Sequence, residues 1–132
     1  MRVVFDTNVL LSSTLWDGSV AQKLLFKFIN ADCAIFSSPP IIAEYQKVLK
    51  RDFDYSDDDI VKIMEKVLSF LKIIKPAKKV DIVKDDPEDN KIIECALASK
   101  SSYIITYDHH LLKFGKIMGI EIMTPEQTLK IL

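Results

Sequence analysis

Short apolar runs alternate with longer amphipathic stretches along the whole chain. The β-branched run at Arg2–Phe5 ends at Asp6 and is typical of a buried strand. Later runs of the same character predict four more strands, at residues 34–36, 72–74, 103–106 and 120–123. Five strands are therefore expected, spread from one end of the chain to the other.

Between these strands, apolar residues recur at helical spacing. Ser19 precedes the first such stretch, which closes at Asn30, and Pro39–Pro40 favour the first turn of a second. Ser56 is a suitable N-cap for a third stretch, whose apolar positions run from Ile60 to Leu71. The remaining helical segments are residues 88–99, a short turn at 109–114 and a terminal helix that opens at Pro125. Strands alternating with helices predict an α/β fold: a three-layer α/β/α sandwich around a mainly parallel five-stranded sheet, with right-handed crossovers.

Composition narrows the class of protein. With 132 residues, 48% hydrophobic and 28% charged, the chain suits one folded domain, residues 1–132, rather than a disordered or repetitive protein. No apolar run approaches the length of a membrane span, and Asp6 interrupts what would be the apolar core of a signal peptide. We therefore expect a cytoplasmic protein with no membrane contact, in which Cys33 and Cys95 are reduced.

Four acidic residues occupy related positions in this pattern. Asp6 and Asp108 directly follow the first and fourth strands, Glu44 lies in the second turn of the helix after strand two, and Asp89 opens the helix before strand four. Ligands of parallel α/β sheets bind outside the carboxyl ends of the strands, so all four are expected near one edge. Like charges gathered there repel one another, and a divalent cation removes that conflict. Oxygen ligands suit Mg²⁺ or Mn²⁺.

Each acid also has a structural alternative. Asp6 could cap a helix over residues 7–11, and Glu44 could form a buried salt bridge. Asp89 could act through the dipole of its helix, and Asp108 could be a turn residue. The acids beside Asp89 could take its functional place: Asp85, Asp86 and Glu88.

Basic residues and histidines complete the candidate chemistry. The net charge of −1 excludes a protein coated in positive charge but allows a local basic patch. Lys47, Lys50 and Arg51 share a helix with Glu44 and are the first candidates for an RNA path. A second candidate is the set of lysines at positions 72, 75, 78 and 79. His109 and His110 are expected to face solvent.

The sequence resembles the PIN-domain family, and more narrowly its single-domain VapC-like members, the toxins of toxin–antitoxin systems. VVFDTNVLLS matches the family's first motif, SSPPIIAEYQKVLKR its second, DDPEDNKIIECALASKSSYIITYDHHLL its third, and IEIMTPEQTL its closing strand and helix. The resemblance covers essentially the whole chain. It departs from many relatives at Tyr107, where a small Gly is common, and at His109, where Lys is common.

This resemblance implies an endoribonuclease that hydrolyses RNA phosphodiester bonds with one or two Mg²⁺ or Mn²⁺ ions, forms a homodimer and has an antitoxin partner. It implies that Asp6, Glu44, Asp89 and Asp108 are the catalytic, metal-binding acids. Three neighbouring polar residues would help shape the site: Asn8, Asn90 and Thr106.

Other functions fit the residues less well. A haloacid-dehalogenase-type phosphatase needs a second Asp two positions after the first, where this chain has Asn8. No Asp suited to accept a phosphoryl group ends the third strand, which disfavours a receiver domain. No Ser-His-Asp or Cys-His set and no Gly-rich phosphate loop stands out. The remaining alternative is a catalytically weak or inactive PIN module that binds RNA or a protein partner.

Overall fold

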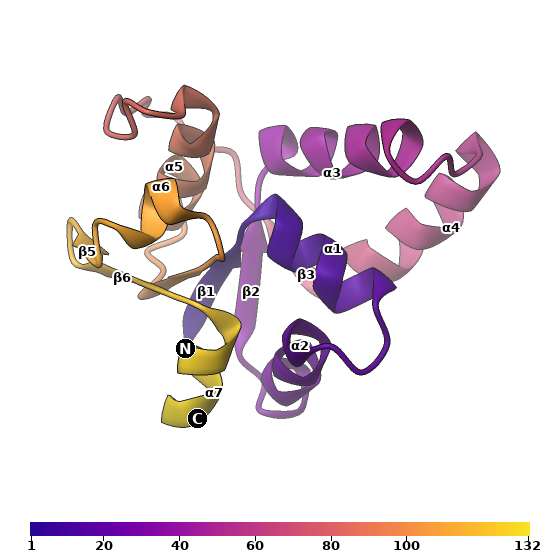
Figure 1. Cartoon of the computed structure of the whole chain (residues 1–132), viewed down its shortest axis with the longest axis horizontal. Helices are drawn as coiled ribbons and strands as arrows, with labels where there is room; N and C mark the ends of the chain where they lie inside the picture. Colours follow the sequence, from indigo (N-terminus) through magenta and orange to yellow (C-terminus); the bar gives the residue numbers. More distant parts are fainter.

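The computed structural model describes residues 1–132, and a twisted sheet runs through its centre (Figure 1). The strands are β1 (Arg2–Phe5), β2 (Ala34–Ser37), β3 (Leu71–Ile73), β4 (Tyr103–Ile105), β5 (Lys116–Ile117) and β6 (Ile120–Met123). The helices are α1 (Thr7–Leu15), α2 (Val20–Asn30), α3 (Pro39–Arg51), α4 (Asp57–Leu68), α5 (Asn90–Ala98), α6 (His109–Leu112) and α7 (Pro125–Ile131), with a 3₁₀ turn, η1 (Pro87–Asp89), before α5.

The sheet has the strand order β3-β2-β1-β4-β6-β5, and every pairing except β5 with β6 is parallel. The predicted α/β class and mainly parallel sheet are therefore confirmed, but the sheet has six strands rather than five. The additional strand, β5, is only two residues long and turns into β6 through Met118 and Gly119, both at positive φ. A two-residue strand has no measurable hydrophobic period, so the sequence pattern did not reveal it.

Several predicted elements differ from the structure in their bounds, most of them by one or two residues. α4 begins at Asp57, where Ser56 and Asp59 form a capping box, and it ends at Leu68. Leu71 is the first residue of β3 and not the end of the helix, because the chain turns at Ser69–Phe70. The helix α1 was expected only if Asp6 acts as an N-cap, and the structure shows that it does.

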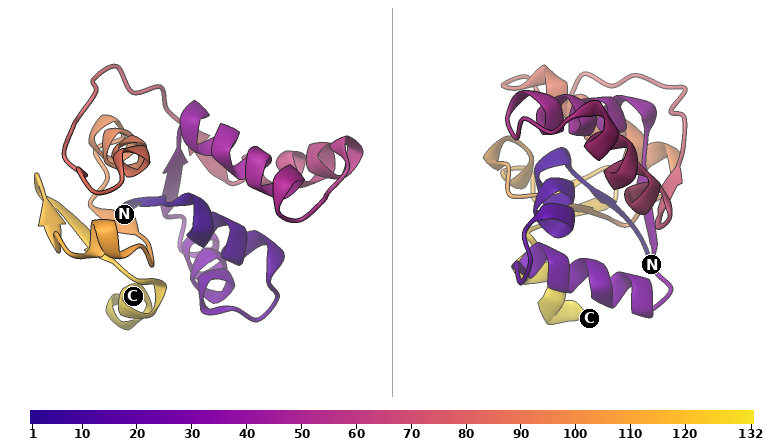
Figure 2. Two further views of the ribbon diagram at one scale, coloured as in Figure 1. Left: turned by 45° about the horizontal axis from the view of Figure 1, so that its top comes forward. Right: turned by 90° about the vertical axis from the view of Figure 1, so that its right-hand side faces the viewer.

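Alternate residues of the strands face two separate cores. Val3, Phe5 and Ile35 point to one face, which is covered by α1 and α2 and by apolar side chains of α3 and α4. Val4 and Ile104 point to the other face, which is covered by α5 and by residues around α6. Figure 2 shows the helices on both sides of the sheet, so the predicted three-layer arrangement is present.

Part of the helical structure extends beyond the edge of the sheet. α3 and α4 extend beyond β3 as a helical pair, at the right of Figure 1. Cys33 and Cys95 are unpaired, and burial in α5 raises the pKa of the Cys95 thiol to about 12. None of the helices is long and apolar enough to span a bilayer.

The strand order also fixes where a ligand could bind. From β1 the chain moves outward to β2 and β3, and then returns to the opposite side of β1 to form β4. The carboxyl ends of β1 and β4 therefore flank a topological switch point, the usual ligand crevice of an open α/β sheet.

Candidate functional site

Hydrogen bonds join the first and fourth acids at this switch point. Phe5 pairs with Ile105 across the sheet, so Asp6 and Thr106 emerge side by side. The Asp6 backbone N–H donates to Ile105 O at 3.1 Å, and the Thr106 hydroxyl donates to Asp6 Oδ2. Thr106 Oγ1 in turn accepts from the Asp108 backbone N–H at 2.9 Å. Thr106 thus fixes Asp6 and Asp108 relative to each other.

Both of these acids also cap helices. Asp6 Oδ1 accepts from the Val9 N–H at 2.8 Å, and Asp108 Oδ1 accepts from the His110 N–H at 2.8 Å. The capping and turn alternatives for these two residues are therefore present in the structure. They do not compete with a metal role, because an ionised carboxylate has about four lone-pair directions and a cap uses only one.

Burial changes the ionisation of Asp6 and Asp89. Asp6 is only 6% exposed, and burial, assisted by the charges of Asp108 and Glu44, raises its pKa to about 6. Asp89, the last residue of η1, is half-buried, and its Oδ2 is enclosed without a hydrogen-bond partner. Burial, followed by the adjacent Asp108 carboxylate, raises the pKa of Asp89 to about 8.

Glu44 lies across the site on α3 and is paired with a cation. The Lys91 ammonium on α5 contacts Glu44 Oε2 at 2.6 Å and Glu88 Oε2 at 3.4 Å. Burial opposes ionisation of Glu44, but the hydrogen bond and charge of Lys91 outweigh it and lower the Glu44 pKa. The Lys91 side chain is 13% exposed and that of Glu44 is 36% exposed, so the pair is only partly buried.

An acidic pocket of about 430 Å³ lies between α3 and the segment from η1 to α6. It is lined mainly by polar and charged side chains: Thr7, Asn8, Glu44, Lys47, Val48, Arg51, Asp86, Glu88, Asp89 and Asp108. Asp6 does not line this pocket, but its charge acts on Glu44, Asp89 and Asp108. The structure thus brings the four predicted acids together, with Asp6 the most deeply buried.

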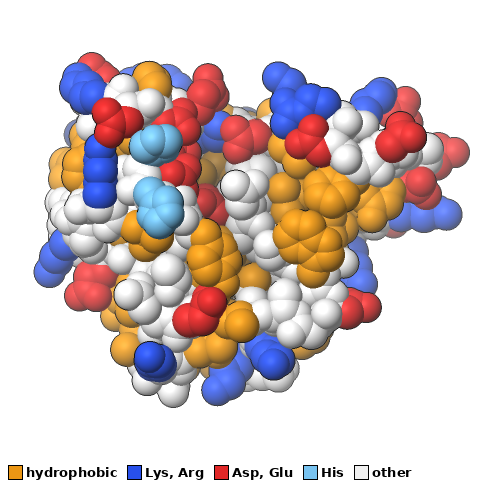
Figure 3. Space-filling model, viewed as in Figure 1, with side chains coloured by type: hydrophobic (Ala, Val, Ile, Leu, Met, Phe, Trp, Pro, Cys, Tyr) orange, Lys and Arg blue, Asp and Glu red, His pale blue; other side chains and the backbone are white.

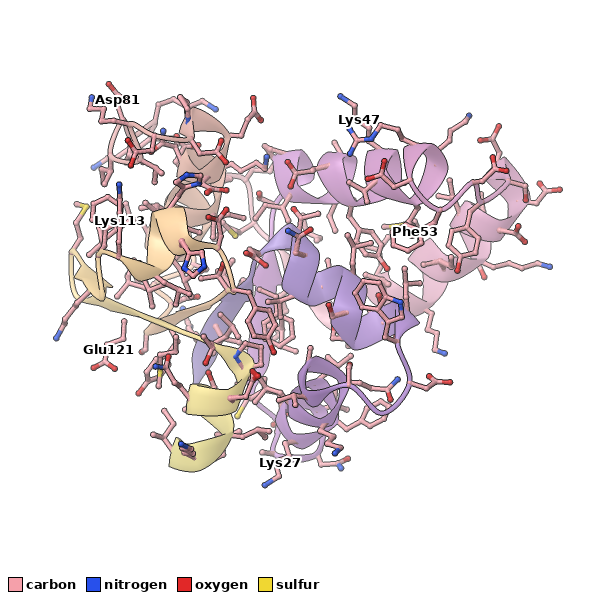
Figure 4. All side chains as sticks on the ribbon, in the orientation of Figure 1. Lys27, Lys47, Phe53, Asp81, Lys113 and Glu121 are labelled. Carbon is pink, nitrogen blue, oxygen red and sulfur yellow. The ribbon has the colours of Figure 1, made fainter.

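The three predicted RNA-binding residues all lie on α3, but only two of them line the acidic pocket. Lys47, labelled in Figure 4, and Arg51 line the acidic pocket. Lys50 does not line this pocket; it pairs with Asp57 of α4 at 2.8 Å and lines a neighbouring surface depression, which Lys47 and Arg51 also border. All three residues therefore border this one depression, where the Lys50 ammonium is held toward the start of α4 by Asp57, and their role in RNA binding stays a prediction.

The predicted supporting residues differ in how they act. Asn8 is exposed and lines the pocket directly. Asn90 is buried and accepts hydrogen bonds from the N–H groups of Ile82 and Val83, both at 2.9 Å, while donating to Pro87 O at 3.0 Å. Asn90 therefore shapes the site indirectly, by holding the loop that carries the acids before α5. Tyr107 does not line the pocket and donates to Glu126 Oε1 at 2.5 Å.

Two further residues lie with these acids: Asp86, expected only as an alternative to Asp89, and His110, expected to face solvent. Asp86, Asp89, Asp108 and His110 each present one potential ligand atom, and these four atoms lie within 4.8 Å of one another. Figure 3 shows the two histidines, in pale blue, among acidic side chains. The neighbouring acids are engaged elsewhere, because Asp85 pairs with Lys113 and Glu88 with Lys91.

Neither Lys91 nor His110 could be assigned to the site from local sequence spacing. Lys91 is 47 residues from Glu44, so no local spacing could indicate their contact. His110 offered a signal only through its position two residues after Asp108, in the short helix that Asp108 caps.

The donor set fits a divalent cation. Its carboxylate oxygens are hard ligands, one enclosed Asp89 oxygen lacks any hydrogen-bond partner, and burial together with the charges of neighbouring acids raises the pKa of Asp6 and Asp89. A cation bound between them would satisfy that oxygen and relieve the repulsion. Together, the fold and this site define an α/β protein with an acidic centre at its sheet switch point.

Comparisons with known proteins identify the family of this chain. The PIN domain family model matches residues 2–110 of the chain. An uncharacterised protein of Methanocaldococcus jannaschii is 30% identical over 135 residues, covering 95% of this chain and 86% of the relative. The chain belongs to the PIN-domain family.

Solved structures share the fold at low sequence identity. VapBC2 from Rickettsia felis, solved with a DNA fragment from their promoter, matches with a TM-score of 0.68 and 17% identity, covering 92% of this chain and 97% of that chain. FitAcB from Neisseria gonorrhoeae matches with a TM-score of 0.63 and 13% identity, covering 94% and 98%. The fold is therefore that of VapC-like PIN proteins.

The raised pKa values predict how stability depends on pH in a metal chelator. Asp89 and Asp6 bind protons more tightly in the folded state than in the unfolded state, where their pKa is about 3.8. The free energy of unfolding should therefore fall as pH rises from about 4 to about 8. Asp89→Asn removes one of these carboxylates and should stabilise the protein at pH 8, on the order of 1 kcal/mol after allowing for solvent screening of a half-exposed group.

Urea unfolding in EDTA at several pH values measures this effect. Glu65→Gln on α4 is the matched control, since Glu65 is exposed and far from the acids in the fold. An Asp89→Asn protein less stable than the unaltered chain at pH 8 would contradict the repulsion.

Proposed function

We propose that residues 1–132 form one metal-dependent endoribonuclease domain that hydrolyses RNA phosphodiester bonds. The observation that supports this is the convergence of Asp6, Glu44, Asp89 and Asp108, from four separate segments of the chain, around one acidic pocket. Mutual repulsion of this kind is costly for folding and is typical of a site built for a ligand or a reaction.

Asp6, Asp89 and Asp108 are the proposed principal ligands of one or two Mg²⁺ or Mn²⁺ ions, and Glu44 completes the set. A divalent ion held there supplies a water of lowered pKa and stabilises the charge on the leaving oxygen. Thr106 keeps Asp6 and Asp108 at a fixed separation through its two hydrogen bonds. Lys91 orients Glu44 and keeps it ionised.

RNA reaches the acids only if its phosphates are not repelled. Lys47 and Arg51 line the same pocket as Glu44, Asp89 and Asp108, so they are placed to bind phosphates beside the acidic centre. Sequence-selective RNA binding targets unpaired bases, because the deep major groove of an RNA duplex excludes side chains. Single-stranded or loop RNA is therefore the proposed substrate.

We further propose that the protein is the toxin of a toxin–antitoxin pair with a protein antitoxin. The VapC-like motifs support this role, as does the fold shared with VapBC2 and FitAcB. The alternative is a PIN module that binds RNA or protein with little turnover. It is favoured by one observation, the engagement of Glu44 by Lys91.

Cleavage of RNA should require both the acids and an added metal ion. Asp89→Asn and Asp108→Asn should each reduce the rate at least ~100-fold, because each removes a proposed ligand of the reacting centre. Asp85→Asn is the matched control, since Asp85 pairs with Lys113 outside the pocket and its loss should leave the rate nearly unchanged. The assay follows single-stranded RNA, duplex RNA and single-stranded DNA with Mn²⁺, Mg²⁺ or EDTA.

Equal cleavage by Asp89→Asn and the unaltered protein would refute the assignment of the site. Metal binding without cleavage of any RNA would favour the inactive module. A preference for DNA or duplex RNA would overturn the substrate class.

Because Lys47 and Arg51 line the acidic pocket and Lys50 does not, the three residues should contribute unequally to RNA binding. Lys47→Ala combined with Arg51→Ala should weaken binding and flatten its salt dependence, by about 0.7 in log–log slope for each phosphate that is no longer neutralised. Lys50→Ala is the control and should change the slope less, because Lys50 does not line the acidic pocket. Fluorescence anisotropy with labelled single-stranded RNA, in the Asp108→Asn background and across a salt series, gives both quantities. An unchanged affinity and slope in the Lys47→Ala, Arg51→Ala protein would place the RNA path elsewhere, with the lysine-rich segment after β3 as the next candidate, and an equal or larger effect of Lys50→Ala would place it over the Lys50 side of α3.

We also propose a homodimer. Large apolar side chains remain exposed on α2 and α4: Phe26, Ile29, Val61 and Leu68. Exposed apolar area of this kind is typical of protein interfaces. Light scattering at micromolar concentration should give the mass of two chains, and Val61→Glu with Leu68→Glu should reduce it. A single-chain mass for the unaltered protein would contradict the proposal.

A further inference from the structure

We infer that Asp86 and His110 belong to the metal centre and that the His110 nitrogen makes it prefer Mn²⁺, or a similar first-row transition ion, over Mg²⁺. The inference rests on the proposed function only in taking Asp89 and Asp108 as metal ligands. It adds two ligands and a metal preference.

The geometry of this cluster is close to that of a bound ion. One atom from each of Asp86, Asp89, Asp108 and His110 lies within 4.8 Å of the other three. Two ligands on opposite sides of a small divalent ion, with bonds of about 2.1 Å, are about 4.2 Å apart. A small contraction would therefore place all four atoms on one ion.

Two of the four residues each carry an enclosed polar atom without a hydrogen-bond partner. Asp89 Oδ2 and His110 Nδ1 are both enclosed, and neither makes a hydrogen bond. His110 Nδ1 lies 3.2 Å from Asp108 Oδ1 and 3.7 Å from Asp86 Oδ2, so it faces carboxylates from both directions. Enclosed polar atoms normally find partners, and a shared cation would be a partner for both atoms at once.

The local fold holds these side chains where they are. Asp86 precedes η1, in the loop that Asn90 fixes through Ile82, Val83 and Pro87. His110 lies in the first turn of α6, and its backbone N–H donates to the carboxylate of Asp108. The ligand positions therefore come from two turns that face each other, independent of the α3 side of the pocket.

The chemistry of the donors sets the preference. Three carboxylates alone would suit Mg²⁺ and Mn²⁺ equally well, since both ions favour hard oxygen ligands. Mg²⁺ is bound through carboxylates, phosphates and waters, whereas imidazole suits first-row transition ions. A ring nitrogen among the ligands should therefore favour Mn²⁺ over Mg²⁺.

A spectroscopic test is available because the chain has only two histidines. Pulsed electron paramagnetic resonance of the untagged protein loaded with Mn²⁺ detects the ¹⁴N nucleus of a directly bound imidazole. The signal should be present in the unaltered protein and in His109→Ala, because His109 is exposed and lies outside the cluster. It should be absent in His110→Ala.

Calorimetric titration with each metal gives the second readout. His110→Ala should lower the affinity for Mn²⁺ at least about 10-fold, while changing that for Mg²⁺ much less. Asp86→Asn should weaken Mn²⁺ binding but keep the ¹⁴N signal. Far-ultraviolet circular dichroism of each variant verifies that it is folded.

The outcomes separate this inference from the proposed function. Mn²⁺ binding that depends on Asp89 but gives no ¹⁴N signal overturns the inference and leaves the nuclease proposal intact. A ¹⁴N signal that persists in His110→Ala, or equal losses of Mn²⁺ and Mg²⁺ affinity, also overturns it. No Mn²⁺ binding at all overturns both.

Discussion

The hydroxyl of Thr106 is the link on which the site depends, because it donates to Asp6 and accepts from the Asp108 backbone. Asp6 begins α1 by capping it, and Asp108 does the same for α6. One buried side chain thus joins two strand ends, two helix starts and two acids. Neighbouring parallel strands bring these groups together only because β4 returns beside β1, at the point where the strand order reverses.

The opposing constraint is the repulsion between the acids. Burial raises the pKa of Asp6 and Asp89, so the ionised pocket weakens the fold that creates it. The chain relieves this repulsion unequally. Lys91 neutralises Glu44 on the α3 side, whereas no cationic Lys or Arg contacts Asp6, Asp89 or Asp108 within ion-pairing distance. The side without such a partner is where a bound cation would have the greatest effect.

The sequence predicted much of this arrangement because hydrophobic periods and caps are local signals. Ser56 was correctly predicted to cap its helix, and the α/β class followed from alternating strands and helices. Contacts between distant segments could not be predicted in the same way. The pairing of Lys91 with Glu44 and of Lys50 with Asp57 depends on how helices pack, and the positions of Asp86 and His110 depend on how two turns face each other. Resemblance to the family identified four acids, but only the folded chain shows which cations and additional ligands surround them.

The central claim is that these acids form a cation site at the sheet switch point. A crystal structure of the protein grown with Mn²⁺, with anomalous diffraction recorded near the manganese absorption edge, tests it most directly. We predict an anomalous peak within bonding distance of the Asp89 and Asp108 carboxylates. A map without a peak there, or with its strongest peak at exposed acids such as Asp57–Asp59 on α4, would contradict the claim.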